Sequence, residues 1–95
     1  MPAATRLGDT CTGHGSFPPR AATEGSPNVF INGQPVHRVG DAWAVHCDSS
    51  GCHPSTTASG SSSVFCNGKP VARIGDDVAC GSVIAKGSSN VFVGG

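Results

Sequence analysis

The sequence predicts an all-β fold in which three equivalent β-hairpins surround one pseudo-threefold axis. The first observation is an internal repeat, because segment 25–41, GSPNVFINGQPVHRVGD, returns as segment 60–76, GSSSVFCNGKPVARIGD. The second is the Asn-Gly pair inside each copy, which lies between two short runs of strand-forming residues and is typical of a two-residue hairpin turn. The third is that no apolar pattern of helical period is present in a chain with 14 glycines and 7 prolines.

A third copy of the repeat is divided between the two ends of the chain. Its first half, GSSNVFVGG, occupies 87–95, and its second half, Arg6-Leu7-Gly8-Asp9, follows the N-terminus. We therefore expect the chain ends to pair and complete a third hairpin. The split favours a closed arrangement over the alternative, an open β-solenoid or a sandwich fragment without a special axis. Each Gly-Asp is expected to end its hairpin and open an irregular loop.

The 95 residues are expected to form one domain, 1–95, without an N- or C-terminal effector extension. Six basic and six acidic residues give zero net charge, which disfavours nucleic acid as a partner. No apolar run approaches the roughly 20 residues that span a bilayer, and no signal-peptide core follows Met1. We therefore expect cytoplasmic synthesis and no stable membrane insertion. Large apolar residues are few, so the thin core needs an additional cross-link.

The five cysteines are an odd number, and in a chain without a leader metal binding or free thiols outrank a disulfide framework. The stretch 42–54, AWAVHCDSSGCHP, holds two histidines and two cysteines. Adjacent residues point in different directions, however, so a self-contained metal site there is the lesser hypothesis. Cys66 aligns with Val93 and is interpreted as a small buried apolar residue. Cys11 aligns with Trp43 and has no predicted metal role.

The repeat register itself indicates a metal site. The fifth position after Gly-Asp is His14 in the split copy and His46 in the first complete copy, and the fourth position after the last Gly-Asp is Cys80. Around a threefold axis these positions converge if their side chains point inward. His53, from the longest loop, can complete the tetrahedron that zinc adopts with nitrogen and sulfur donors. Four protein ligands make such an ion structural, with a binding free energy of roughly 10–16 kcal/mol that contributes to folding.

Alternatives to this ligand set stay open on the residues alone. Cys47 or Cys52 could replace His53 as the fourth ligand, or the two cysteines could form a local disulfide outside the cell. His37 lies within a hairpin where the second copy has Ala72. We therefore interpret His37 as a surface position and not as a ligand.

These features resemble the PAAR-repeat family, named for a Pro-Ala-Ala-Arg motif followed shortly by Gly-Asp. The motif stands here as Pro35-Val36-His37-Arg38 and as Pro70-Val71-Ala72-Arg73, so neither copy is literal, but both keep the proline and the arginine. The likeness covers nearly the whole chain. It includes the Gly-Ser-x-x-Val-Phe openings and the pair Cys80-Gly81 after the last Gly-Asp.

The resemblance implies a small cone of β-hairpins whose apex is held by one zinc ion with three histidines and one cysteine. Matched motif by motif, these ligands are His14, His46, His53 and Cys80. It also implies that the base of the cone caps a trimeric VgrG-like spike, in type VI secretion or a contractile phage tail, with one monomer per trimer. Any effector proteins would be attached non-covalently or through the spike. The chain would be cytoplasmic before assembly and then be delivered outside the cell or into a target cell.

The action implied is mechanical, since a rigid, sharp tip pierces a membrane and no catalytic residue is needed. Two other classes of function stay as hypotheses. A small zinc-dependent hydrolase would need three protein ligands, an open position and a general base, for which Asp48 is the carboxylate nearest the histidines in the sequence. A free-standing secreted domain would instead rely on disulfides.

Overall fold

The computed structural model describes residues 1–13 and 17–94, and of Asp48 it describes the backbone alone. The described residues form six strands and no helix, which confirms the all-β prediction. The strands are β1 (Phe30–Ile31), β2 (Gln34–Pro35), β3 (Ala42–Asp48), β4 (Gly51–Thr56), β5 (Phe65–Cys66) and β6 (Lys69–Pro70). They pair antiparallel as β1–β2, β3–β4 and β5–β6. Within this part of the chain there is accordingly no helix that could cross a bilayer.

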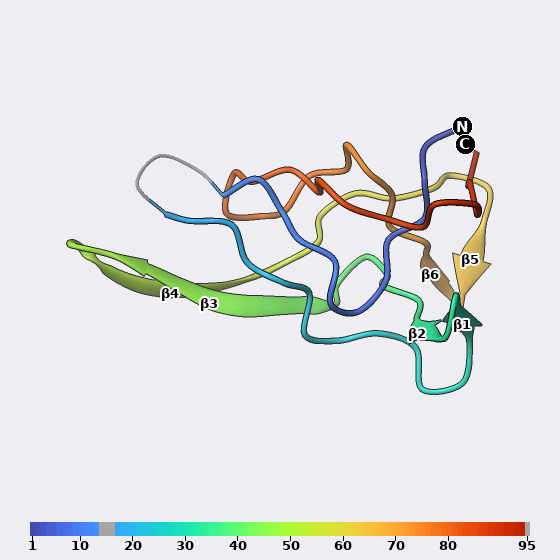
Figure 1. Cartoon of the computed structure of the whole chain (residues 1–95), viewed down its shortest axis with the longest axis horizontal. Helices are drawn as coiled ribbons and strands as arrows, with labels where there is room; N and C mark the ends of the chain where they lie inside the picture. The colour runs from blue at the N-terminus through green and yellow to red at the C-terminus, as the bar shows by residue number, and fades with distance from the viewer. Residues whose placement is uncertain (14–16, 95) are drawn as a thin grey trace.

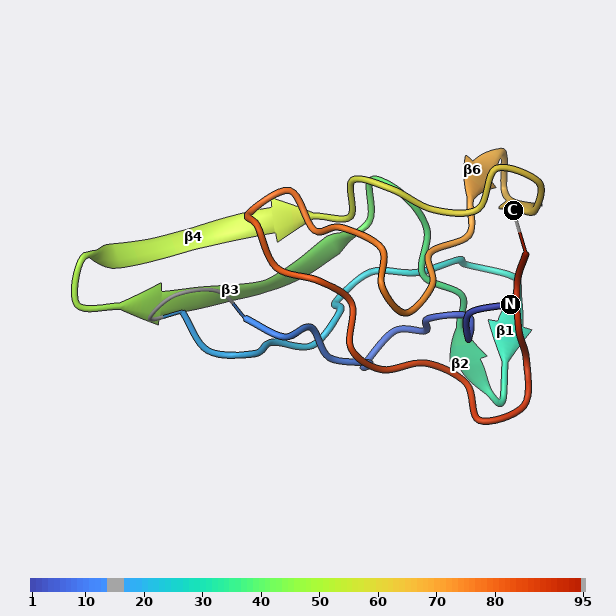
Figure 2. The ribbon, with the colours of Figure 1, turned by 90° about the horizontal axis from the view of Figure 1, so that it is seen from above.

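The molecule is elongated, with principal extents of 38, 24 and 23 Å. Strands β1, β2, β5 and β6 lie at one end together with both chain termini, and the β3–β4 hairpin projects at the other end (Figures 1 and 2). We call the end with the four short strands and the termini the base, and the end with the β3–β4 hairpin the apex. The long axis therefore separates the repeated hairpins from a feature that one copy alone carries.

The two Asn-Gly pairs form the turns that the sequence predicts. Asn32 and Gly33 have φ angles of 54° and 79°, and Asn67 and Gly68 have φ angles of 55° and 78°. Two consecutive positive φ angles define the type I′ turn, whose twist matches that of the flanking strands. The turns set the register, so Phe30 pairs with Pro35 in β1–β2 and the equivalent residues pair in β5–β6.

The chain ends form the third hairpin, as the divided repeat predicts. Ala3 and Phe92 make an antiparallel bridge, and the Val93 amide donates to the Pro2 carbonyl at 2.9 Å. The Ala4 amide donates to the Val91 carbonyl at 3.0 Å. A hairpin built from the two termini closes the arrangement and leaves neither end of the repeat unpaired.

The Gly-Ser pair that opens each copy has a structural role for both residues, because the serine caps backbone amides and the glycine allows close backbone contact. In each, the serine hydroxyl accepts hydrogen bonds from the amides two and three residues later, as Ser61 does from Ser63 at 3.1 Å and Val64 at 2.9 Å. A Cβ added at Gly60 would lie 2.8 Å from the Val71 carbonyl oxygen. Glycine is needed there because the opposing backbone approaches too closely for any side chain.

The pseudo-threefold axis is marked by a cyclic set of backbone hydrogen bonds. The Thr5 amide donates to Ala72 at 2.9 Å, the Ala72 amide to His37 at 3.0 Å, and the His37 amide to Thr5 at 3.0 Å. Each of these residues precedes the arginine of its copy, and each is 0% exposed. The ring ties all three copies together at the centre of the molecule.

The interpretation of His37 as a surface position is therefore wrong. Its Nδ1 lies 2.8 Å from the Glu24 carbonyl oxygen and its Nε2 lies 2.7 Å from the Thr57 hydroxyl, and Trp43 Nε1 donates to the same hydroxyl at 2.8 Å. Burial lowers the pKa of His37. Alignment with alanine was misleading because alanine occupies surface and core positions alike, and here Ala72 is itself on the axis.

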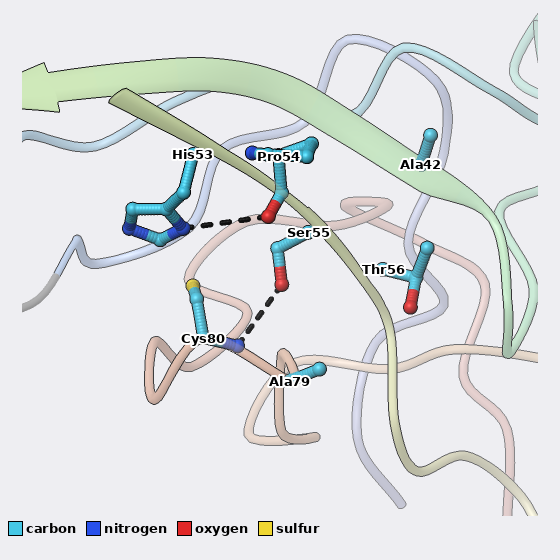
Figure 3. Close-up of a pocket in the computed structure, with 7 residues that line it drawn as sticks. All are labelled: Ala42, His53, Pro54, Ser55, Thr56, Ala79 and Cys80. Atoms are coloured by element: carbon cyan, nitrogen blue, oxygen red, sulfur yellow. Dashed lines mark hydrogen bonds between the residues drawn. The ribbon is translucent and has the colours of Figure 1, made fainter. Parts of the chain in front are cut away.

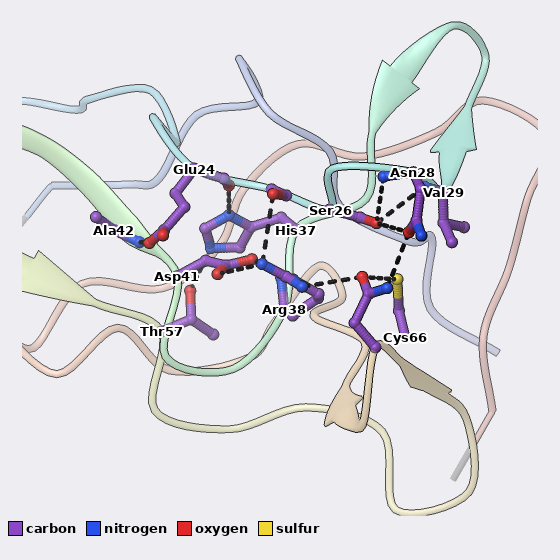
Figure 4. A network of polar contacts seen from close by, with 12 residues as sticks. Glu24, Ser26, Asn28, Val29, His37, Arg38, Asp41, Ala42, Thr57 and Cys66 are labelled. Carbon is purple, nitrogen blue, oxygen red and sulfur yellow. Dashed lines mark hydrogen bonds and ion pairs between the residues drawn. The ribbon is translucent and has the colours of Figure 1, made fainter.

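Each copy also contains an arginine–aspartate pair that holds its Gly-Asp turn. The Arg Nε to Asp Oδ2 distances are 2.9 Å for Arg6–Asp9, 2.7 Å for Arg38–Asp41 and 3.0 Å for Arg73–Asp76. In every pair the arginine amide donates to the same Oδ2 atom and Nη2 donates to Oδ1. Figure 4 shows the Arg38–Asp41 pair beside buried His37.

The arginines also join neighbouring copies. Arg6 Nη1 donates to the Asn32 side chain at 3.1 Å, and Arg38 Nη1 donates to the Asn67 side chain at 2.9 Å. These two guanidinium groups thus bind the Asn-Gly turn of a neighbouring hairpin as well as the aspartate of their own copy. The motif arginine and the Gly-Asp are consequently one structural unit repeated three times.

Among the described residues, two apolar clusters fill the interior. The cluster near the base contains Cys66, which is 5% exposed and packs with Val36, Val71 and Val93, so its interpretation as a small buried apolar residue is confirmed. The second cluster contains the residues that follow each Gly-Asp by two positions. These are Cys11, Trp43 and Val78, joined by Ala22, Ala72 and Ile84.

The segment after the second Gly-Asp departs from the expected irregular loop. It forms the long β3–β4 hairpin, with Asp48 paired to Gly51 across a turn at Ser49 and Ser50 and with an irregularity of register between Trp43 and His46. The run Ala-Trp-Ala-Val-His-Cys contains enough strand-forming residues. The irregularity, however, interrupts the alternation of apolar and polar residues by which a strand is identified in a sequence.

Candidate metal centre

Three of the four predicted ligands lie together near the apex. His46 on β3 pairs in register with His53 on β4, and Cys80 comes from the loop after the last Gly-Asp. Their ligand atoms all lie within 4.8 Å of one another. The fourth predicted ligand, His14, lies outside the described residues. The structure therefore places side chains from two of the three copies, plus the additional His53, around one point.

Hydrogen bonds orient both imidazoles so that Nε2 is the nitrogen directed at the centre. His46 Nδ1 lies 2.9 Å from the Pro18 carbonyl oxygen, and His53 Nδ1 lies 3.3 Å from the carbonyl oxygen of Pro54. A carbonyl oxygen can only accept, so Nδ1 donates in each ring and Nε2 is the nitrogen that can bind a metal once it carries no proton. An outer hydrogen bond of this kind fixes the tautomer of a metal-binding histidine.

The two Nε2 atoms are 3.0 Å apart. Two lone pairs at that separation repel unless a proton or a cation lies between them. In a tetrahedral zinc site the nitrogen–nitrogen separation is ~3.3 Å, as follows from Zn–N bonds of about 2.0–2.1 Å. The observed separation is that of a hydrogen bond between the two rings, in which one Nε2 donates, and it is close to the separation that a shared zinc ion would require.

Cys80 is held toward the histidines by the edge of β4. Its amide donates to the Ser55 hydroxyl at 2.9 Å, and Figure 3 shows the Cys80 sulfur and the His53 ring facing the same space. Cys80 also packs against the cluster that contains Trp43. A thiol and two imidazoles are soft and borderline donors, which suit zinc better than calcium or magnesium.

Phe17 covers the site, and nothing in the sequence indicated that role. Its ring centroid lies 4.9 Å from that of His46 and 4.4 Å from that of His53. An aromatic ring over both imidazoles restricts water on that side and keeps the ligands in place. Phe17 stands at no position that the repeat register marks, so only the three-dimensional arrangement identifies it.

Cys47 and Cys52 are joined to each other by a disulfide. They pair one position farther along the hairpin than the histidines, and successive side chains on a strand point to opposite faces. The alternative in which either cysteine replaces His53 is therefore not what the structure shows. For this pair, the expectation that metal binding or free thiols account for the cysteines is wrong. Cys11, Cys66 and Cys80 are free.

The hydrolase hypothesis requires a general base, and the candidate for that role is Asp48. Asp48 is paired through its backbone with Gly51, but its side chain lies outside the described part of the structure. The hypothesis stays an untested prediction.

The comparison with protein families agrees with the geometry. The model of the PAAR motif matches residues 12–86, which include both complete repeats and the positions of all four predicted ligands. A search of curated proteins found no match. The repeated arginine–aspartate pairs, the closed ring of hairpins and this match lead to one conclusion: the chain belongs to the PAAR-motif family of spike-tip proteins.

Proposed function

We propose that this chain caps a trimeric VgrG-like spike through its base, with one monomer per trimer. The observation that carries the proposal is a threefold set of exposed apolar side chains. Phe30, Phe65 and Phe92 occupy equivalent positions in the three hairpins and are 56%, 58% and 52% exposed. Large aromatic residues are costly to leave in water, and an exposed group of them marks an interaction surface.

The surroundings of the three phenylalanines extend the same surface. Val29 and Val64, which precede two of them, are 42% and 41% exposed, and Met1 is 86% exposed. Together with Phe65 and Phe92 they border an apolar hollow at the base, whose floor includes Val36 and Val71. A partner with three identical apolar contacts would meet the same chemistry in each third of this surface.

A monomer with internal pseudo-threefold symmetry can close the end of a true trimer without a symmetry conflict. The base hairpins are only two residues per strand, so we expect their backbone to add to the strands of the spike in the manner of β-augmentation. The role is structural. Effector proteins, where present, would be bound non-covalently, and the chain would leave the cytoplasm with the contractile apparatus.

We further propose that the candidate metal centre holds one structural zinc ion, with His14 as the fourth ligand beside His46, His53 and Cys80. His46 and His53 would bind the ion through Nε2, and Cys80 would bind it as a thiolate. These residues would thereby cross-link β3, β4 and the loop of Cys80, and stiffen the apex opposite the spike. Binding free energy of a closed site is folding free energy, which offsets the small core.

The docking proposal is tested by mixing the purified chain with a purified VgrG-like trimer and measuring the mass of the complex by light scattering. We expect one chain per trimer. Phe65→Asp should weaken binding at least ~30-fold, because a buried aromatic contact contributes about 2 kcal/mol or more. Val45→Asp is the matched control, since Val45 is 52% exposed on β3 at the apex, and it should bind normally.

Two outcomes contradict the docking proposal. One is a complex with three chains per trimer, and the other is an equal loss of affinity for Phe65→Asp and Val45→Asp. The metal proposal has a separate measurement, the zinc content of the purified chain. About one zinc per chain is expected, and loss of that zinc in His46→Ala without loss in a Cys11→Ala control would identify the site.

A further inference from the structure

The β3–β4 hairpin contains two cross-strand pairs of chemically reactive residues in adjacent positions. His46 pairs with His53, and Cys47 pairs with Cys52 one step nearer the turn. The cysteine pair is oxidised to a disulfide, while the histidine pair contributes to the candidate metal centre. Both pairs therefore link the same two strands, and they lie one residue apart along each strand.

The two pairs face opposite sides of the hairpin, because side chains alternate along a strand. The histidine side is covered by Phe17. On the other side, Cys47 and Cys52 are both solvent-exposed. The disulfide can thus form or open without any change in the set of metal ligands.

Exposure distinguishes this pair from the other cysteines. Cys11 and Cys66 are 3% and 5% exposed and pack inside the two apolar clusters, and Cys80 belongs to the candidate metal centre. A dissolved thiol or disulfide reacts with accessible sulfur. Cys47 and Cys52 are consequently the cysteines that such a reagent reaches most directly.

We propose that Cys47 and Cys52 are a redox site whose state controls the affinity of the neighbouring metal centre. The oxidant is a low-molecular-weight disulfide. One cysteine thiolate attacks it, forms a mixed disulfide and releases one small thiol, and the second cysteine then displaces the other small thiol. The two protein thiols lose two electrons and two protons, and the small disulfide becomes two thiols. The proposal rests on the metal centre described under the proposed function.

Coupling between the two sites follows from their shared strands. Closing the disulfide removes alternative arrangements of the strands that carry His46 and His53, so less ordering remains for the metal to impose. The oxidised chain should therefore bind zinc more tightly than the reduced chain. Linkage makes the effect reciprocal, so bound zinc should favour the disulfide by the same factor.

The test compares zinc affinity in the two redox states of the full chain by competition with a chromophoric chelator. One sample is reduced, the other is treated with oxidised glutathione, and mass spectrometry confirms the loss of two hydrogens. We expect a Kd lower by about tenfold for the oxidised chain, within the usual range of coupling between sites. The double variant Cys47→Ser, Cys52→Ser is the control, and its Kd should not respond to the oxidant.

Each other outcome overturns a stated part of the reasoning. Equal Kd values for the oxidised and reduced chains overturn the coupling and leave the zinc centre standing. A lower Kd for the reduced chain also overturns it, because the free thiols would then be acting as ligands. Zinc binding by neither form overturns the metal centre together with the coupling. Oxidation that proceeds equally in the double variant shows that one or more of Cys11, Cys66 and Cys80 react instead and refutes the assigned redox site.

Discussion

Replacing Asp41 by asparagine should destabilise the fold more than the same change at the equivalent Asp9. The Asp41 side chain is 0% exposed and the Arg38 side chain 8%, and Asp41 holds the arginine through its Oδ1 and Oδ2 atoms. The Asp41 carboxylate raises the pKa of Arg38, but an arginine in a protein stays protonated without such a partner, so the guanidinium remains charged in the variant. Asparagine has nearly the same shape, and the change leaves no cavity.

The magnitude follows from burial. Removing one partner of a buried ion pair leaves an uncompensated charge and costs about 3–5 kcal/mol. At Asp9 the exposed fractions are 15% for the arginine and 6% for the aspartate, and water reaches the guanidinium. There the cost should be nearer the value for losing hydrogen bonds to a charged group, about 1.5–3 kcal/mol.

Urea unfolding followed by fluorescence measures the difference, since Trp43 is the single tryptophan and is buried at 4% exposure. With a slope of roughly 1.5 kcal/mol per molar urea, a loss of 3–5 kcal/mol moves the midpoint by roughly 2–3 M. Both variants are compared at saturating zinc. Equal midpoints for Asp41→Asn and Asp9→Asn would show that burial does not govern these pairs and would refute the reasoning.

Four further predictions concern other parts of the fold. His37→Ala should cost about 2–4 kcal/mol in urea unfolding, because it opens a cavity and removes the ring that bonds Thr57; a silent variant would contradict its burial. Since burial lowers the pKa of His37, the unfolded chain binds the proton first, and wild-type stability should fall below pH ~6.5 by up to about 1.4 kcal/mol per pH unit. His37→Gln should remove that part of the slope when both proteins are melted at saturating zinc. Ser61→Ala should lower the free energy of unfolding by about 1 kcal/mol or more, because it removes the acceptor of two amides and the donor to the Gly94 carbonyl, whereas Ser89→Ala, at an exposed serine of the divided copy, should cause no change. Gly68→Ala, at φ 78°, should cost about 1 kcal/mol or more by thermal melting, and an unchanged melting temperature would argue against the type I′ turn.

The parts of the fold that could be predicted from the sequence are those in which the residue type is a local requirement. Asn-Gly indicates a type I′ turn wherever it occurs between strand formers, and the divided repeat requires the chain ends to meet. The φ angles at Asn67 and Gly68 and the Ala3–Phe92 bridge bear this out. The register argument likewise brought His46 and Cys80 to one place, because equivalent positions lie at equal distances from the axis.

What failed was the inference of side-chain environment from alignment between copies. The alignment equates His37 with Ala72, which is correct for the backbone, as the cyclic hydrogen bonds show. It says nothing about which side of the backbone faces the interior, since alanine is compatible with either. His37 fills its buried position by bonding Thr57, a residue that the other copies replace with Ala22 and Ile84 in the apolar cluster.

The three copies differ more toward the apex. This gradient agrees with the proposal that the base docks on a threefold partner while the apex holds a single metal ion. At the base the exposed residue is phenylalanine in every copy. At the centre, the position two residues after Gly-Asp is Cys11, Trp43 or Val78, depending on the copy. These residues can differ because a packed interior needs the right total volume and not three side chains of the same size. At the apex a single copy supplies the whole β3–β4 hairpin. A threefold partner can constrain only the surface it touches, so symmetry in the chemistry is expected at the surface where the proposed spike would dock. The proposed metal ion would need four donors from whichever copies can reach it, and such a site places no demand for symmetry on the apex.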